Sequence, residues 1–404
     1  PILEVLKELW PGAVSIVGGV HASNTTPILL RNHLVDYVLR GEGEIAFSQF
    51  LDQMAAGKTP GGIKGLYTRK DLVQLGPLEM AEPVPDLDAL PLPDWDILQI
   101  DGYLDARTGW RNWLMPPGDK RSAGFQATRG CPNKCTYCSA HTVHGRNVRL
   151  RSVDKVLEEI RLLHEKYGVN LFVPWDDLMT ANKKRLLAIL SGMRAMNIPG
   201  LEMQFPNGLH VGTMDEEIVD AMVDTGCSAF TFAIESGSEF TQKHIINKRC
   251  NLDKARRLIE YVRAKGVMSI CYWIVGLPGE TKELMAESYA YAKSLSTDWI
   301  VFSKAIPLVG TEIFNKYVEK GYFKADDVNQ WTGNSFYLRS FDTEEGSAYD
   351  LSDLVCRMSY EYNFVNNISL KDGTFQRAVD IYSTFLGKDP NNVFALYCTA
   401  KAKA

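Results

Sequence analysis

The feature that most constrains the fold is an alternation of short apolar runs and amphipathic segments that repeats from Gly124 onward. Runs of this length predict buried strands, and the segments between them predict helices. Alternating strands and helices are typical of a parallel sheet wound around one axis. The sequence therefore predicts an α/β fold whose centre is a partial (β/α)6 barrel. The expected strands are Phe125 to Thr128, Leu171 to Trp175, Glu202 to Phe205, Ala229 to Ile234, Ser269 to Val275 and Trp299 to Lys304. The expected helices lie near Val153 to Lys166, Lys183 to Met196, Asp215 to Asp224, Leu252 to Lys265 and Lys282 to Leu295.

The segments on either side of this barrel differ from it in pattern. Residues 1–75 alternate helix and strand but contain only two or three strands, which predicts a Rossmann-like α/β remnant. Residues 76–120 are rich in Pro and Asp and predict an ordered linker to the barrel core at residues 121–325. Residues 326–404 predict an α-helical tail that ends like half a tetratricopeptide repeat, which we expect to dock on the barrel or to begin an array. Because the chain begins with Pro1, we expect it to be N-terminally incomplete.

Composition excludes several classes of protein. With 45% hydrophobic and 23% charged residues, the 404-residue chain is ordinary for a globular protein. No apolar run reaches the roughly 18 residues that cross a bilayer, so we expect no membrane association. A net charge of -5 with scattered Lys and Arg argues against nucleic acid as a partner. Signal and transit peptides are not recognisable, which predicts a cytoplasmic protein with reduced thiols.

Three of the eight cysteines crowd into the loop after the first expected strand. Cys131, Cys135 and Cys138 can wrap one corner of an iron-sulfur cube, which leaves the fourth iron open. An open metal position is typical of a catalytic site. The alternative is a structural zinc site with His141 as the fourth ligand and His144 as a spare. Both interpretations stay open on the cysteines alone.

Carboxylates and glycines follow other expected strands, where barrels place their active sites. Asp176 and Asp177 follow the second strand and suit an ammonium group, although an Asp there could also cap the next helix. Glu235 and Ser236 end the fourth strand, and a carboxylate at the mouth of an apolar run needs a partner. That partner could be a ligand or a structural ion pair. The fifth strand runs into a tight turn that lets backbone approach a flat ligand, and it contains Gly276, Pro278 and Gly279.

The Pro307 to Thr311 loop after the sixth strand could belong to the same site or simply lead into a helix. Asn207, Gly208 and Lys248 are weaker candidates for the site.

Together these motifs resemble the radical S-adenosylmethionine (SAM) superfamily over Gly124 to Phe323. The signature is C-x3-C-x2-C with an aromatic residue, here Tyr137, before the last cysteine. The resemblance implies a 4Fe-4S cluster on the three cysteines and SAM that chelates its open iron. It also implies that the Asp pair lies at the SAM amino group and Glu235 at the ribose or methionine moiety. The turn at Gly276 would then pack along adenine, with Tyr272 where the family has its first glycine.

The N-terminal segment adds a second resemblance. Gly18 and Gly19, in Val17 to Ser23, and the stretch Asp36 to Glu44 resemble the end of the cobalamin-binding domain of one radical SAM branch. That branch includes cobalamin-dependent methylases and the anaerobic magnesium-protoporphyrin ester cyclase. The family's D-x-H-x-x-G motif, which carries the cobalt-facing histidine, is absent from this sequence. Cobalamin is therefore expected in an intact parent of this chain rather than in the chain itself.

The function that this resemblance implies is oxygen-sensitive radical chemistry. The enzyme would cleave SAM reductively and functionalise an unactivated carbon by methylation or oxidative cyclisation. A small-molecule or peptide substrate and a reductant such as flavodoxin or ferredoxin are the expected partners. The alternatives are a methylthiotransferase-like enzyme and a non-catalytic, zinc-bearing interaction protein. The substrate and the catalytic acid, base or radical-quenching residue are left open.

Overall fold

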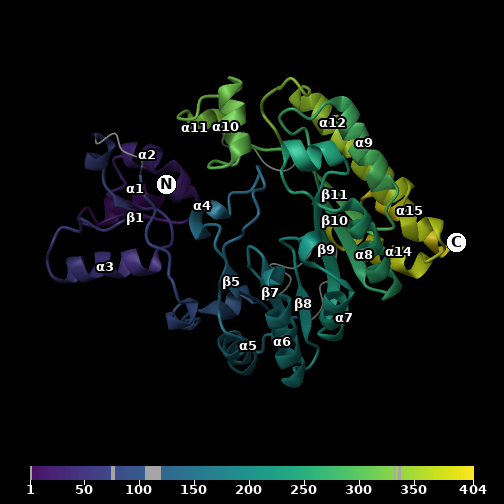
Figure 1. Cartoon of the computed structure of the whole chain (residues 1–404), viewed down its shortest axis with the longest axis horizontal. Helices are drawn as coiled ribbons and strands as arrows, with labels where there is room; N and C mark the ends of the chain where they lie inside the picture. The colour runs from purple at the N-terminus through teal and green to yellow at the C-terminus, as the bar shows by residue number, and fades with distance from the viewer. Residues whose placement is uncertain (1, 74–77, 105–119, 332, 335–337) are drawn as a thin grey trace. The chain divides into compact units, whose positions relative to one another are not determined.

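The computed structural model describes residues 2–73, 78–104, 120–331, 333–334 and 338–404 (Figure 1). Residues 105–119 of the predicted linker therefore lie outside the described part. By its internal contacts the chain divides into two compact units, which are treated one at a time. Unit 1 comprises residues 1–87, 129–149 and 307–332, and unit 2 comprises residues 88–128, 150–306 and 333–404.

Unit 2 is built on a six-stranded parallel sheet with strand order β11-β10-β9-β8-β7-β4. Each strand pairs with the next one along the barrel sequence, so the expected parallel α/β barrel core is confirmed. Strands β9 and β10 are the longest, and they pair with each other. The strands are β4 (Ser122–Phe125), β7 (Leu171–Pro174), β8 (Glu202–Gln204), β9 (Cys227–Glu235), β10 (Met268–Val275) and β11 (Trp299–Lys304).

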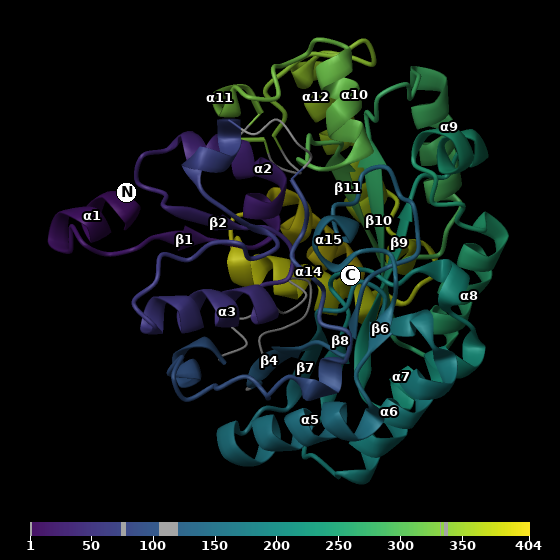
Figure 2. The same cartoon turned by 60° about the vertical axis from the view of Figure 1, so that its left-hand side comes forward.

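Five helices form an outer layer along this sheet, as Figure 2 shows. They are α5 (Val153–Tyr167), α6 (Lys183–Ala195), α7 (Glu216–Asp224), α8 (Leu252–Ala264) and α9 (Lys282–Lys293). A polar residue caps the start of each one, and its side chain accepts a hydrogen bond from a backbone N–H of the first turn. Apolar side chains from these helices and from the strands form one continuous buried core. The caps explain why the sequence placed the helix starts within one residue.

The first barrel strand was predicted three residues too late. The structure forms β4 from Ser122–Phe125, while Thr128–Arg129 form β5 in a separate two-stranded ladder with β6 (Arg149–Leu150). A Cβ at Gly124 would lie 1.7 Å from the Trp175 indole nitrogen, so only glycine permits this close packing. The small residues of β4 carry little apolar signal, and the sequence pattern missed the strand for that reason.

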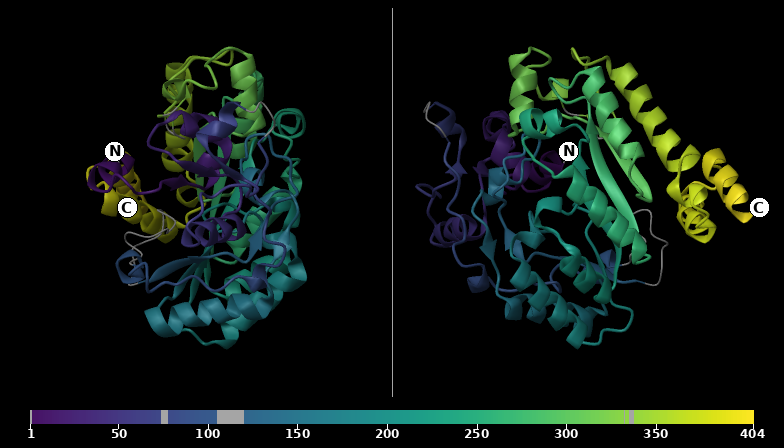
Figure 3. Two further views of the ribbon diagram at one scale, coloured as in Figure 1. Left: turned by 90° about the vertical axis from the view of Figure 1, so that its left-hand side faces the viewer. Right: turned by 45° about the vertical axis from the view of Figure 1, so that its right-hand side comes forward.

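The C-terminal region is helical and docks on the sheet of unit 2. Helix α12 (Ala348–Tyr360) contacts β11, and Figure 3 shows it leading to α14 (Phe375–Lys388) and α15 (Val393–Lys403). The last two helices pack on the face of the sheet opposite the main core, through buried residues that include Ile270, Trp299 and Tyr382. The expected helical tail is confirmed, and it buries its apolar face against the barrel.

Unit 1 contains a three-stranded sheet in the order β1-β2-β3. Strands β1 (Ile16–Val17) and β2 (Tyr37–Leu39) are parallel, and β3 (Leu66–Tyr67) is antiparallel to β2. Helix α2 (Val20–Arg31) begins directly after Gly19, and the remaining helices of this segment are α1 (Ile2–Leu9) and α3 (Glu44–Ala55).

The other short helices of the chain are α4 (His141–His144), α10 (Glu312–Glu319), α11 (Val328–Trp331) and α13 (Ile368–Lys371). Short 3-10 or π turns lie at Arg69–Val73, Leu87–Ala89, Ile100–Tyr103, Met179–Ala181, Val211–Thr213, Thr241–Ile245 and Glu361–Val365. Within the described residues, no helix combines the length and the apolar character needed to cross a bilayer.

Candidate functional site

The cysteine loop lies in unit 1, after β5. Cys131, Cys135 and Cys138 are all half-buried. The Cys131 N–H donates to the Gly145 carbonyl at 3.3 Å, which closes the loop on itself. Three cysteine sulfurs within eight residues suit an iron-sulfur cluster in their donor chemistry. In the described part of the chain, no three His, Cys, Asp or Glu side chains lie close enough together to hold a metal ion. The three cysteine sulfurs would therefore have to move closer together to bind a cluster.

Glu42 anchors both ends of this loop. Its carboxylate accepts hydrogen bonds from Arg129 at 3.2 Å and from Arg149 at 2.9 Å, and these two arginines flank the cysteines in sequence. The backbone N–H of Val84 also donates to it. Burial alone would raise the pKa of Glu42, but the bonds from Arg149 and Val84 hold it below its usual value. In the sequence, Glu42 stood out only as part of the stretch that resembles a cobalamin-binding domain. Its bonds to the two arginines beside the cysteine loop were not predicted.

The Pro307 to Thr311 loop belongs to unit 1, where the Thr311 side chain caps α10. The other predicted residues of the barrel lie in unit 2, at or near the carboxyl ends of its strands. Asp176 follows β7 and is 7% exposed, and its Oδ2 accepts a hydrogen bond from the Ala127 N–H at 3.2 Å. Burial raises its pKa to about 6. Helix α6 is capped by Asn182, whose side chain accepts from Arg185 N–H, so the helix-cap interpretation of Asp176 and Asp177 is wrong.

Glu235 ends β9 with a φ of 73°, a left-handed conformation that is unusual for a residue other than glycine. Its carboxylate pairs with Lys248 at 3.0 Å, and both side chains are buried. The Gln242 amide donates to the carbonyls of Ile234 and Ser236, which fixes the turn. A buried ion pair on strained backbone is typical of a site held ready for a ligand. The ion pair considered from the sequence is therefore present in the structure.

Hydrogen bonds with buried side chains hold the turn after β10 in place. Gly276 and Gly279 have φ values of 76° and 88°, and Glu280 accepts backbone hydrogen bonds from Gly276 at 2.9 Å and Leu277 at 3.2 Å. Burial raises the pKa of Glu280 to about 7. The buried Arg339 donates to the Gly276 carbonyl at 3.2 Å. The C-terminal region thus braces this turn, which sequence patterns did not indicate.

A small cavity of about 20 Å³ lies between the ends of β7 and β8. Asp176 and Asp177 line it together with Thr180, Asn207 and His210. Two predicted regions of the barrel, the Asp pair and the weaker candidate Asn207, therefore share one cavity. His210 was not predicted, because a single histidine in a loop gives no pattern.

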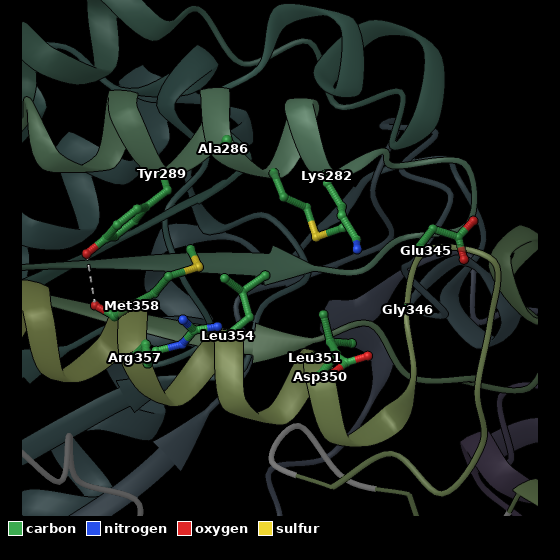
Figure 4. A pocket seen from close by; sticks show the side chains of 11 residues that line it. Lys282, Ala286, Tyr289, Glu345, Gly346, Asp350, Leu351, Leu354, Arg357 and Met358 are labelled. Atoms are coloured by element: carbon green, nitrogen blue, oxygen red, sulfur yellow. Dashed lines mark hydrogen bonds between the residues drawn. The ribbon is translucent and has the colours of Figure 1, made fainter.

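A larger groove of about 390 Å³ runs between α9 and α12 (Figure 4). Met285, Leu354 and Met358 form its apolar lining, and Lys282 and Glu345 stand at one end. None of the predicted site residues lines it.

In unit 1, the Gly18-Gly19 pair forms the turn between β1 and α2. Gly19 has a φ of 93°, and its carbonyl accepts from the Ser23 N–H at 2.9 Å. A strand, a glycine turn and a helix N-terminus follow one another here, an arrangement suited to close approach of a ligand.

Residues 125–292 match the family model described as "Radical SAM superfamily". Residues 125–292 therefore form a radical SAM domain, which includes the cysteine loop and strands β7 to β10.

Among curated proteins, the chain is similar to cytidylyl-2-hydroxyethylphosphonate methyltransferase of Streptomyces wedmorensis, with 28% identity over 81% of this chain and 65% of that protein. It is also similar to the anaerobic magnesium-protoporphyrin IX monomethyl ester cyclase of Rubrivivax gelatinosus, with 25% identity over 79% of this chain and 56% of that protein. The chain thus spans less than two thirds of the length of these relatives.

Among solved structures, the fold resembles the radical SAM methyltransferase TsrM from Kitasatospora setae with bound cobalamin and 4Fe-4S cluster. The TM-score is 0.60 at 17% identity, over 79% of this chain and 60% of that one.

Proposed function

We propose that this chain carries out radical SAM chemistry and functionalises an unactivated carbon by methylation or oxidative cyclisation. The observation that carries this proposal is the loop of three half-buried cysteines inside a domain that matches the superfamily. The similar curated proteins are methyltransferases and a cyclase, which favours these two outcomes over methylthiotransfer. The similarity to these proteins also favours an iron-sulfur cluster over a structural zinc site.

In this proposal Cys131, Cys135 and Cys138 would hold a 4Fe-4S cluster, which would supply the electron for reductive cleavage of SAM. Asp176 and Asp177 accept hydrogen bonds from the SAM amino group. Glu235 and Ser236 bind the ribose or methionine moiety, with Lys248 holding the Glu235 carboxylate in place. The backbone turn of Gly276, Pro278 and Gly279 packs along adenine. The apolar strands around these groups exclude water from the reacting atoms.

We further propose that the Gly18 and Gly19 turn contacts cobalamin in a protein that contains a complete cobalamin-binding domain. The strand, turn and helix in unit 1 support this, together with the cobalamin bound in TsrM. A small-molecule or peptide substrate, a flavodoxin or ferredoxin reductant and a cytoplasmic location complete the proposal.

The test is anaerobic reconstitution with iron and sulfide, followed by dithionite and SAM and an assay for 5'-deoxyadenosine. We expect product from the wild-type chain and from the matched control Cys356→Ala, whose cysteine is exposed and lies outside the loop. We expect no product and a clear loss of bound iron from Cys135→Ala. Stoichiometric zinc in the isolated protein, with no 5'-deoxyadenosine after reconstitution, would reject the proposal in favour of a structural metal.

A further inference from the structure

Helix α15 (Val393–Lys403) is apolar on both of its sides. Its inner side is buried against α14 and the sheet of unit 2 and consists of Ala395, Cys398 and Ala402. Because an α-helix turns about 100° per residue, the opposite side is an outer face that consists of Val393, Leu396, Tyr397 and Ala400. The first three side chains of this outer face are 71%, 46% and 69% exposed. A helix that is apolar all round is normally buried on every side, so the outer face is suited to a partner.

The exposed apolar surface continues from α15 onto the end of α12. The centroid of the Phe394 ring lies 4.5 Å from that of the Tyr360 ring, and the two residues are 43% and 40% exposed. Phe394 and Tyr397 are three residues apart on one helix and are therefore neighbours on its surface. Figure 3 shows α14 and α15 next to each other at the C-terminal end of unit 2. A contiguous apolar patch marks an interaction site, whereas scattered exposed apolar residues do not.

The spacing along the outer face points to a helix as the partner. Its four residues lie at positions i, i+3, i+4 and i+7, which is the apolar stripe that one helix presents to another. In stacked helical repeats, such a stripe is buried against the next helix of the stack. The α14–α15 pair resembles half of one repeat and docks by its inner side, so a further helix is needed to cover the outer face.

The charges at the two ends of α15 are opposite in sign. Lys401 and Lys403 are exposed on the last turn, one on each side of the outer face, and Asp389 is exposed shortly before the first turn. The 11 residues of this helix span about 16 Å, so the lysines and Asp389 of one chain are too far apart to pair with each other. A second α15 that runs antiparallel brings the lysines of each copy to the Asp389 end of the other. A parallel arrangement would instead place lysines against lysines.

We propose that the outer face of α15 binds the same face of a second copy of this chain, antiparallel and about a two-fold axis. The two-fold axis lets the apolar stripe meet itself and pairs both charged ends at once. This self-complementarity favours a second copy over a helix of another protein. One helix of 11 residues gives an interface below the usual size of stable complexes, so we expect a weak dimer with a Kd on the order of 10 μM. The inference is independent of the proposed function.

The first experiment tests the apolar stripe by sedimentation velocity of the whole chain over a range of concentrations. We expect wild-type protein to change from monomer to dimer as its concentration rises. Leu396→Glu places two like charges in the dry centre of the interface and should weaken the dimer about tenfold or more. The matched control is Tyr349→Glu on α12, which also replaces an exposed apolar residue, 80% exposed, and should leave the Kd unchanged.

The second experiment tests the antiparallel orientation by exchanging charges between the two ends. Asp389→Lys alone, and Lys401→Glu combined with Lys403→Glu, each turn the expected attraction into repulsion and should weaken the dimer about fivefold or more. An equal mixture of these two variants restores opposite charges at both ends of the pair. We therefore expect the mixture to dimerise to within about threefold of the wild type.

Three results would overturn the inference. A wild-type chain that stays monomeric tenfold above the expected Kd would assign the outer face to a different partner. Equal Kd values for Leu396→Glu and Tyr349→Glu would place the dimer interface elsewhere on the molecule. A mixture of the charge variants that associates no more tightly than each variant alone would exclude the antiparallel arrangement. Thermal unfolding of each variant shows that these comparisons are made on folded protein.

Discussion

At the scale of single residues, the buried carboxyl group of Glu280 makes the stability of the fold around the turn after β10 depend on pH. Only 1% of the residue is exposed, and its carboxylate accepts hydrogen bonds from two backbone N–H groups, with no ion-pair partner among the described residues. The folded-state pKa is raised from 4.5 to about 7 by burial, with a smaller contribution from the charge of Glu345. The stabilising contribution of the protonated form is therefore complete below about pH 4.5 and is lost as the pH rises through about 7.

Replacement of Glu280 by Gln should remove this pH dependence. The amide keeps an oxygen acceptor for the turn and carries no charge, so Glu280→Gln should be more stable than the wild type at pH 8. The pKa shift of Glu280 corresponds to roughly 3 kcal/mol of unfolding free energy. The difference in stability between the variant and the wild type should vanish near pH 4.5. Thermal unfolding across this pH range measures it, with the exposed Glu283→Gln as the matched control. Unfolding midpoints that stay parallel for Glu280→Gln and the wild type at every pH would contradict the prediction.

The sequence supports a prediction of site residues only where they lie in local patterns. The three cysteines have a fixed spacing, and Asp176 and Glu235 each follow an apolar run that marks a strand end. His210 and Arg339 have no such pattern, because their environments are made by residues distant in the chain. The Gly276 carbonyl that Arg339 contacts is 63 residues away. Burial of a polar side chain by distant segments cannot be read from the local sequence.

At the scale of elements, the cysteine loop depends on an anchor that lies outside it. Glu42 bonds to Arg129 before the cysteines and to Arg149 after them, so one buried carboxylate restrains both ends of the loop. We predict that Glu42→Ala leaves two partly buried arginines without this partner and lowers the iron retained after anaerobic reconstitution, by about half or more. Breaking a buried ion pair is costly, whereas an exposed pair contributes little.

The matched control for the loop is Glu44→Ala. Glu44 also pairs with Arg129, at 2.6 Å, but its side chain is 34% exposed. We expect this variant to retain iron like the wild type, as measured by iron analysis and by the electron paramagnetic resonance of the reduced cluster. Equal iron contents in Glu42→Ala and Glu44→Ala would show that the anchor has no special role.

The sequence predicted the starts of helices that have a hydrophobic periodicity and a polar N-cap to within one or two residues. It did not predict the positions of short elements that lack both features. Helices α5 to α9 have both features, and their starts agree with the sequence. Strand β4 consists largely of small residues, and β3 has only two residues, so neither gives a periodic signal. Their positions are decided by the neighbouring strands with which they pair.

At the scale of the whole molecule, residues far along the chain complete the barrel of unit 2. Arg339 braces the turn after β10, and α14 and α15 cover the sheet face that the outer helices leave open. The sequence predicted a helical tail that would dock, because half a tetratricopeptide repeat cannot bury its own apolar side. It could not specify which face of the sheet would receive the tail, since both faces carry apolar residues.

The attachment of this tail should depend on Asp298, which is fully buried between Arg263 of α8 and Arg377 of α14. Arg377→Met keeps much of the side-chain volume but leaves the buried carboxylate with one cation fewer. We expect a loss of roughly 3 kcal/mol in unfolding free energy and faster proteolysis within α14 and α15. The control is Arg357→Met, which breaks an exposed pair with Asp353 on α12 and should change stability by less than about 1 kcal/mol. If chemical denaturation gave equal stabilities for the two variants, Asp298 would not be what holds the tail to the sheet.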